Sequence, residues 1–168
     1  MPAATAHRYL IALGSNVRHT RFGPPRRVLA AALERLEADG VRVIAAAPVN
    51  ETDPVGPSIR RYANAAAVIE TKVRPLELLA ALKHIERAFG RRPGGQRWSA
   101  RVLDLDIVLW SGGPFVAAGL TIPHPLFRMR DFVLTPAVRI APRWRDPLTG
   151  LTVRQLHARL TRPRPVRR

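Results

Sequence analysis

Two acidic residues in the most strand-like stretch of the chain could bind a metal ion. Asp104 and Asp106 alternate with leucine and isoleucine across residues 102–110 (VLDLDIVLW). Because successive side chains of a strand point to opposite faces, the two carboxylates share one face, about 6.6 Å apart along the backbone. At an effective dielectric near ~20, carboxylates about 6 Å apart repel by roughly 2.8 kcal/mol, so the pair needs a compensating cation. Mg²⁺ suits this spacing, since it binds through one or two carboxylates, water and substrate phosphates. A solvated strand face or salt bridges to arginine are the alternatives.

Cationic side chains and an indole directly precede the aspartates. Residues 97–101 (RWSAR) lead into the acidic stretch, and Arg91 and Arg92 begin the same segment. The guanidinium group of an arginine can donate two parallel hydrogen bonds to the oxygens of one phosphate. The face of Trp98 can stack on a heteroaromatic ring. Next to a candidate magnesium site, these residue types predict chemistry on a nucleoside triphosphate.

A histidine between two prolines follows the acidic stretch. His124 lies between Pro123 and Pro125, and Arg130 comes six residues later. A lone histidine is more often structural than catalytic. A histidine held rigidly beside an arginine in a phosphate site, however, can donate to a transferring group.

Apolar periodicity predicts the elements that carry these residues. Each of two amphipathic segments has a proline in its first turn and a glycine just after its end, which is typical of helices. Together with four segments of strand character, these two helices follow one another along the chain in the order βαββαβ. This order predicts a ferredoxin-like α+β plait, a four-stranded antiparallel sheet with both helices on one face. The predicted strands are 8–13, 41–49, 62–71 and 102–110, and the predicted helices are 25–38 and 75–89.

The rest of the chain connects or extends this plait. Residues 50–61 contain proline and glycine and read as irregular, and residues 91–100 read as an exposed loop. The C-terminal additions are a short hairpin near 115–120, a helical piece at 126–134 and a helix at 152–160. We expect one domain over residues 1–161 and a disordered Pro/Arg tail, 162–168.

Composition limits the class of protein. A chain of 168 residues with 46% hydrophobic and 24% charged residues is typical of one globular domain. It has no cysteine, which excludes disulfides, a thiol nucleophile and cysteine-ligated metal. Without a leader-like start or an apolar run of about 20 residues, we expect no membrane association and a cytoplasmic location.

The net charge of +16, from 28 Lys and Arg against 12 Asp and Glu, favours anionic partners. The arginines are spread from Arg8 to Arg168. A solvated basic surface without a dedicated partner is therefore an equal alternative.

Five motifs in order resemble those of the 6-hydroxymethyl-7,8-dihydropterin pyrophosphokinase family of folate biosynthesis. Residues 97–109 (RWSARVLDLDIVL) resemble the family's signature. The other four motifs are Gly14-Ser15-Asn16, residues 52–57 (TDPVGP), residues 62–66 (YANAA) and Ile122-Pro123-His124. Each motif is weak alone, but the five in this order and spacing are specific. The fold of the family is the ferredoxin-like plait, in agreement with the order of elements above.

The resemblance implies transfer of a pyrophosphoryl group from ATP to the hydroxymethyl oxygen of the pterin, with release of AMP. Asp104 and Asp106 would hold two Mg²⁺ ions on the triphosphate, and Asp106 would help to activate the substrate hydroxyl. Arg91 lies on a loop that in such enzymes closes over the substrates and excludes water. The remaining residues that match the family's ATP ligands are Trp98, Arg101, Ile107, His124 and Arg130.

The resemblance also implies a pterin site. Asn64 offers both a donor and an acceptor, which matches the amide-like edge of a pterin. Trp98 and Phe132 would sandwich the ring. The other matching positions are Thr52, Val55 and Tyr62, and Glu86 also matches a family position.

Three residues depart from the family's pattern. Ser99 stands where glycine or alanine is usual, Pro93 where a second loop arginine is common, and Asp53 where proline is common. Either Arg92 takes the role of the missing arginine or loop closure is weaker. A family member with altered substrate or reduced activity is therefore one alternative.

A basic nucleic-acid-binding module is an alternative of another class, since plaits of this kind also stack RNA bases on sheet-face aromatics. That function predicts aromatic residues on the central strands, where this chain has Asp104 and Asp106. Unless a metal is bound, these carboxylates would repel a phosphodiester backbone. We therefore expect two small-molecule substrates, no specific nucleic acid and a monomer.

Overall fold

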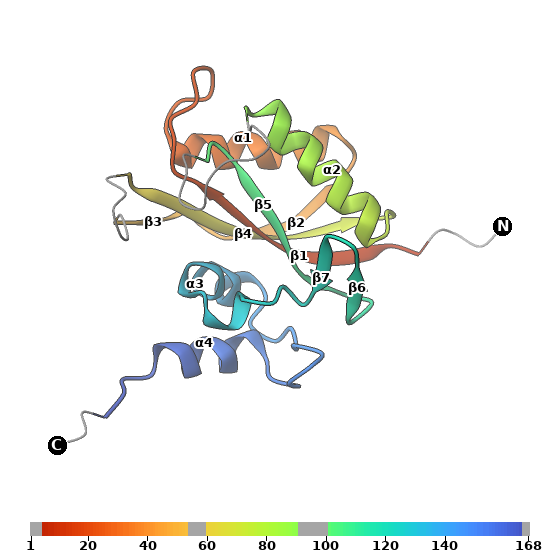
Figure 1. Ribbon diagram of the computed structural model, residues 1–168, viewed down its shortest axis with the longest axis vertical. Coiled ribbons are helices and arrows are strands. Elements are labelled where there is room, and N and C mark those ends of the chain that lie inside the picture. The colour runs from red at the N-terminus through yellow and green to blue at the C-terminus, as the bar shows by residue number, and fades with distance from the viewer. Residues whose placement is uncertain (1–4, 54–59, 91–100, 166–168) are drawn as a thin grey trace.

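The computed structural model describes residues 5–53, 60–90 and 101–165. Its helices and strands form a mixed α+β domain (Figure 1). The strands of the main sheet are β1 (His7–Ser15), β2 (Arg42–Ala46), β3 (Asn50–Thr52), β4 (Tyr62–Thr71) and β5 (Asp104–Trp110). The helices are α1 (Pro25–Ala38), α2 (Pro75–Ala88), the short 3-10 helix η1 (Phe127–Met129), α3 (Asp131–Ile140) and α4 (Val153–Thr161). A separate hairpin consists of β6 (Phe115–Ala117) and β7 (Leu120–Ile122).

Every pairing in the main sheet is antiparallel. The strands lie in the order β2-β4-β1-β5, and the short β3 pairs with the first residues of β4. The centre of the sheet is β1, whose residues pair with β4 on one side and β5 on the other. Segments that are far apart in sequence therefore meet across β1.

The two faces of the sheet are covered differently. Alternate residues of β1, Tyr9, Ile11 and Leu13, are buried under α1 and α2, and Leu10 is buried on the other face. Helix α3 packs against β4 on this second face, and α4 packs against α3 (Figure 1). Of the described helices on the second face, α3 covers only part of the sheet, and the ends of β1, β4 and β5 that lie beyond it line a cavity.

Most predicted elements are present, and several bounds differ. The bounds predicted for α1 and β4 match the structure. The strand predicted over 41–49 is shorter, Arg42–Ala46, and its pairing with β4 shifts register between Val43 and Ala45. The segment predicted as irregular over 50–61 contains β3, which is too short to show periodicity. The helical piece predicted at 126–134 is η1 followed by α3, and the hairpin extends to Ile122.

The prediction of a four-stranded sheet with helices on one face is incomplete. The sheet has five strands, and α3 and α4 form a layer on the opposite side from α1 and α2. Apolar side chains on that side, among them Val68 and Val108, are buried only because this layer covers them. The C-terminal segments are therefore part of the core.

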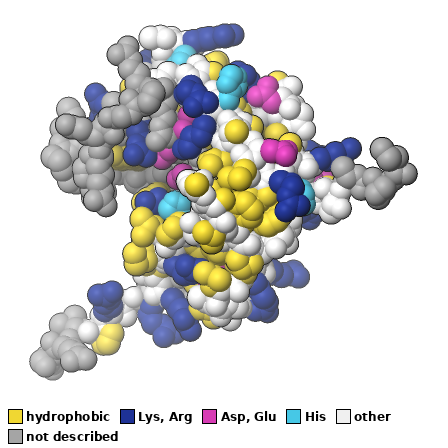
Figure 2. All heavy atoms as spheres, turned by 45° about the vertical axis from the view of Figure 1, so that its right-hand side comes forward, with side chains coloured by type: hydrophobic (Ala, Val, Ile, Leu, Met, Phe, Trp, Pro, Cys, Tyr) yellow, Lys and Arg dark blue, Asp and Glu magenta, His cyan; other side chains and the backbone are white. Residues whose placement is uncertain are grey.

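The surface agrees with the spread of arginine along the sequence. Figure 2 shows Lys and Arg side chains dispersed over the visible face, with hydrophobic side chains between them. Within the described ranges, no helix is long and apolar enough to span a membrane.

A buried ion pair holds the second layer together. Asp146 is fully buried and accepts hydrogen bonds from both Arg128, with Nη2 to Oδ1 at 2.7 Å, and Thr149, with Oγ1 to Oδ2 at 2.7 Å. Burial alone would raise the pKa of Asp146, but these bonds and one from the Leu148 amide outweigh burial and lower the pKa to about 2. The ionised carboxylate therefore stabilises the folded chain.

We predict that Asp146→Asn lowers the free energy of unfolding at pH 7 by about 2 kcal/mol. The pKa of Asp146 is lower in the folded than in the unfolded chain, so its contribution is present above about pH 4 and is lost as the pH falls toward 2. Urea unfolding at several pH values measures the loss of unfolding free energy and its dependence on pH. Asp39→Asn, in an exposed pair with Arg35, is the control and should change stability by less than about 0.5 kcal/mol. Equal effects of the two substitutions would contradict the assignment.

Candidate active site

The open part of the sheet forms the floor of a cavity because β1 has small residues there. Along the face that α3 partly covers, β1 presents Leu10, Ala12 and Gly14 in turn. Gly14 lies opposite Asn64 on β4 and Asp104 on β5. A side chain at Gly14 would place its Cβ 3.4 Å from Asn64 Oδ1. Glycine therefore leaves room between a polar strand and an acidic strand.

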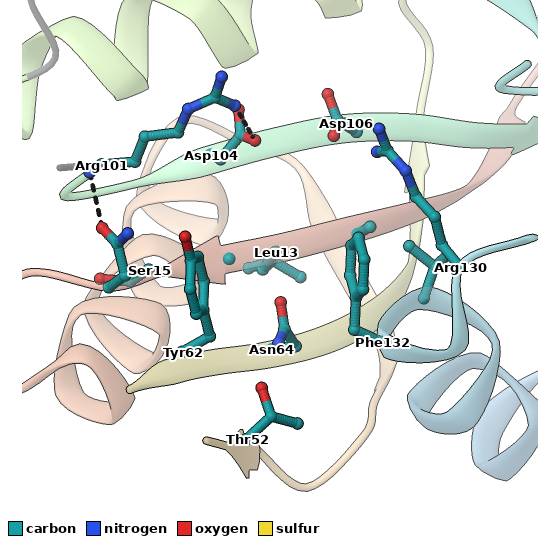
Figure 3. A pocket seen from close by; sticks show the side chains of 14 residues that line it. Leu13, Ser15, Thr52, Tyr62, Asn64, Arg101, Asp104, Asp106, Arg130 and Phe132 are labelled. Carbon is teal, nitrogen blue, oxygen red and sulfur yellow. Dashed lines mark hydrogen bonds and ion pairs between the residues drawn. The ribbon is translucent and has the colours of Figure 1, made fainter. Parts of the chain in front are cut away.

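The cavity has a volume of about 420 Å³ and gathers residues from strands and loops that are distant in sequence. It includes most of the predicted site residues that lie in the described ranges (Figure 3). These are Thr52, Tyr62, Asn64, Arg101, Asp104, Asp106, Arg130 and Phe132. The chain thus brings together eight of the residues that the sequence singled out.

The two aspartates share a face, as their spacing predicts. Asp104 pairs with Arg101, with Nη1 to Oδ2 at 2.9 Å (Figure 3). Burial raises the pKa of Asp106, and the carboxylate of Asp104 raises it further, against the opposing charges of Lys83, Arg130 and Arg101. One carboxylate is thus neutralised by arginine, and the other is held in an environment that favours its protonated form.

Asn16 fixes the segment that precedes the aspartates, a role that the sequence did not reveal. The side-chain Oδ1 of Asn16 accepts a hydrogen bond from the backbone N–H of Arg101 at 2.7 Å. The backbone N–H of Asn16 donates to the backbone carbonyl of Arg101 at 3.0 Å. Asn16 is 4% exposed, so these bonds are shielded from water. The Gly14-Ser15-Asn16 motif was recognisable, but only the fold shows that it joins the end of β1 to the start of β5.

The other wall of the cavity is suited to a flat polar ring. Tyr62 and Phe132 stand on opposite sides of Asn64, and Thr52 lies beyond it on β3 (Figure 3). Asn64 is buried, whereas Phe132 is 44% exposed. An aromatic ring exposed beside a buried amide leaves both available to a ligand.

The start of α3 sets the positions of Arg130 and Phe132. Arg130 is the residue before the helix, and its carbonyl accepts the N–H groups of Val133 and Leu134. Its guanidinium lies 5.5 Å from the centre of the Phe132 ring. Arg130 therefore extends toward the aspartates while its backbone is held by the helix (Figure 3).

Asp106 is shared with a second cavity of about 320 Å³. His124 and Ile107, predicted as ATP contacts, line this second cavity and not the first. Lys83 on α2 also lines it. The predicted residues thus divide between two neighbouring cavities that meet at Asp106.

His124 is arranged as a neutral donor. Its Nδ1 accepts the backbone N–H of Leu126 at 3.1 Å, so the proton of the neutral ring belongs on Nε2. Burial lowers the pKa of His124, and Arg130 lowers it further, with Asp104 opposing. A neutral ring with an Nε2–H can donate to a phosphate oxygen.

Arg91, Val55 and Trp98 lie outside the described residues, as do the departures at Pro93 and Ser99.

Asp53 is described, and its Oδ1 lies 3.2 Å from Nη2 of Arg61. Both side chains are mostly exposed. The negative charge that this residue adds next to Thr52 is therefore partly offset by its own arginine.

The donor set fits magnesium better than a metal that requires an all-protein site. Among the described residues, no group of three or more His, Asp or Glu side chains could hold a metal ion. Asp104 and Asp106 supply two carboxylates on one face, beside cavities open to a ligand. Mg²⁺ characteristically uses one or two carboxylates and takes its other oxygens from water and phosphate.

The fold and the site define an α+β protein whose carboxylate pair lies where two cavities meet. Residues 10–142 match the family described as 7,8-dihydro-6-hydroxymethylpterin-pyrophosphokinase (HPPK). The chain therefore belongs to the HPPK family.

Relatives with the name 2-amino-4-hydroxy-6-hydroxymethyldihydropteridine pyrophosphokinase are similar over most of the chain. The protein from Synechocystis is 35% identical over 151 residues, 89% of this chain and 74% of its own length. The protein from Pseudomonas aeruginosa is 38% identical over 142 residues, 83% of this chain and 84% of its own. That from Methylorubrum extorquens is 37% identical over 155 residues, 91% of this chain and 93% of its own.

Solved structures support the fold. The wild-type HPPK-DHPS structure from Plasmodium falciparum matches 92% of this chain with a TM-score of 0.72 at 15% identity. A triple mutant of the same protein with SDX-DHP matches with a TM-score of 0.74. This chain spans 41% and 45% of those chains, less than half of their length.

We predict that Asp106→Asn stabilises the metal-free chain at neutral pH. The pKa of Asp106 is raised in the folded state, so its ionised form disfavours folding above that pKa, and a neutral amide avoids this cost. The melting temperature should rise at pH 7.5, and the gain should shrink as the pH falls and disappear below the unfolded-state pKa of about 3.8, where the acid is protonated in both states.

Asp104→Asn is the matched control for this measurement. Asp104→Asn removes the pair with Arg101 but also relieves the repulsion of Asp106, so it should raise the melting temperature less than Asp106→Asn does. A lower melting temperature for Asp106→Asn than for the unmodified chain would be inconsistent with a destabilising charge at this position.

Proposed function

We propose that this chain transfers a pyrophosphoryl group from ATP to 6-hydroxymethyl-7,8-dihydropterin, giving the pterin diphosphate and AMP. Membership of the HPPK family and the names of relatives at 35–38% identity support this activity. The observation that carries it in the structure is the position of Asp106, which lines both cavities. A carboxylate at the junction of two ligand sites can act on the atoms that pass between them.

We assign the first cavity to the pterin and the second to ATP, with the transferred phosphates reaching the side of the first cavity that Arg101 and Arg130 line. Asn64 would pair with the polar edge of the pterin, and Tyr62 and Phe132 would contact its ring. His124 and Ile107 would contact ATP, together with Arg91 and Trp98. The pterin hydroxyl and the β-phosphorus then meet beside Asp106.

The hydroxymethyl oxygen of the pterin must attack the β-phosphorus of ATP. The bond between the β-phosphorus and the oxygen that bridges it to the α-phosphate breaks, and AMP leaves with that oxygen. Arg101 and Arg130 provide positive charge for the phosphate oxygens, and His124 donates from Nε2. Asp106 polarises the attacking hydroxyl. Asp104 and Asp106 would hold two Mg²⁺ ions, which when bound neutralise the charge of the triphosphate.

The order of the strands supports a finer assignment of the fold. With β3 set aside as an extension of the edge, β1-α1-β2-β4-α2-β5 folds into the order β2-β4-β1-β5, with both helices on one face. We assign this core to the ferredoxin-like plait. A single domain over 1–161, a disordered tail at 162–168, a monomeric state and a cytoplasmic location stay predictions.

The product identifies the reaction. Incubation of the chain with ATP, Mg²⁺ and 6-hydroxymethyl-7,8-dihydropterin should release AMP and pterin diphosphate in equal amounts, measured by chromatography. Formation of ADP would indicate ordinary phosphoryl transfer and contradict the proposal. The absence of turnover would favour a family member with altered substrate.

We predict that Asp106→Ala lowers kcat/KM by at least about 100-fold, since it removes a charge that acts in the transition state. Asp39→Ala, at an exposed acidic residue outside both cavities, is the control and should keep full activity. Circular dichroism checks that both variants fold. Unchanged activity of Asp106→Ala would refute the role of the carboxylate pair.

A further inference from the structure

Lys83 and Glu86 form a pair on α2 beside the second cavity. Nζ of Lys83 lies 3.4 Å from Oε2 of Glu86. The Glu86 side chain is 1% exposed, whereas that of Lys83 is 39% exposed. A buried carboxylate requires a compensating charge and hydrogen bonds. The pair is therefore oriented with its anion inside the protein and its ammonium toward solvent.

Glu86 also holds the strand that carries the aspartates. Its Oε1 accepts the backbone N–H of Leu105 at 2.8 Å. Among the described strands, β5 is at the edge of the main sheet, so a buried N–H on its outer side needs an acceptor from another element. Leu105 lies between Asp104 and Asp106. Glu86 thus fixes the backbone at the centre of the carboxylate pair.

Lys83 faces the same space as Asp106 and His124. All three line the second cavity, with apolar side chains such as Leu79 and Ile107. The positive charge of Lys83 also opposes the rise in the pKa of Asp106. The cavity therefore combines an ammonium, an imidazole donor and an apolar wall, as a nucleotide's phosphates and base require.

We propose that Lys83 binds a phosphate oxygen of the nucleotide in the second cavity, and that Glu86 is the positioning residue that holds both Lys83 and the backbone of β5. This inference rests on the proposed function. Lysine binds phosphate as a point charge, and an ammonium already held by a carboxylate loses less freedom when it binds.

Chemical labelling tests this assignment directly, because the chain has only two lysines. Lys72 is exposed before α2 and lines neither cavity. Pyridoxal 5′-phosphate followed by borohydride marks accessible amines, which peptide mass spectrometry quantifies. A non-hydrolysable ATP analogue with Mg²⁺ should reduce labelling of Lys83 at least about fivefold and leave Lys72 unchanged.

Calorimetric titration of the unmodified chain with the same analogue tests the proposed function separately from the Lys83 contact. Failure of the analogue to bind the unmodified chain would overturn the proposed function and this assignment with it. Binding without protection of Lys83, or with equal protection of both lysines, would overturn the assignment alone.

Kinetics provide the second readout. Lys83→Ala should raise KM for ATP about tenfold and leave KM for the pterin unchanged, and Lys83→Arg should keep most of the ATP affinity. Lys72→Ala is the matched control. An unchanged KM for ATP in Lys83→Ala would refute the contact.

Glu86→Gln tests the positioning role, because the amide keeps an acceptor for Leu105 N–H and removes the charge that holds Lys83. It should raise KM for ATP by about threefold with little loss of thermal stability. Glu77→Gln, an exposed acid on the same helix, should change neither quantity. A loss of stability without a change in KM would reduce Glu86 to a structural residue.

Discussion

The repulsion between two carboxylates on one strand is the constraint on which the site depends. Asp104 and Asp106 point into the same recess, where burial and like charge both oppose ionisation of Asp106. Three cations from separate elements oppose this effect. They are Arg101 from the segment before β5, Arg130 from the residue before α3 and Lys83 from α2. Such a pair of carboxylates favours the binding of a metal ion, and a bound metal ion in turn coordinates phosphate oxygens.

The fold creates that recess by covering the two faces of one sheet unequally. Within the part of the chain that the structure describes, helices α1 and α2 cover one face, while α3 covers only part of the other. Small residues on β1 deepen the uncovered part, and the buried pair of Arg128 and Asp146 secures the layer that holds Arg130 and Phe132.

Much of this arrangement could be predicted from the sequence, for physical reasons. Strand periodicity placed Asp104 and Asp106 on one face, and the prolines and glycines around α1 and α2 marked their ends. The family resemblance selected eight residues that line one cavity. The roles of Asn16 and Glu86 were not predictable, because each depends on a backbone group contributed by a distant segment. The burial of α3 and α4 against the sheet was likewise a matter of tertiary packing.

A crystal structure of the chain with Mg²⁺, a non-hydrolysable ATP analogue and 6-hydroxymethyl-7,8-dihydropterin would test the central claim most directly. The account predicts metal bound to both Asp104 and Asp106, with the analogue's phosphates beside them and the pterin against Asn64. Aspartates that contact only arginine side chains, with the nucleotide bound elsewhere, would contradict it.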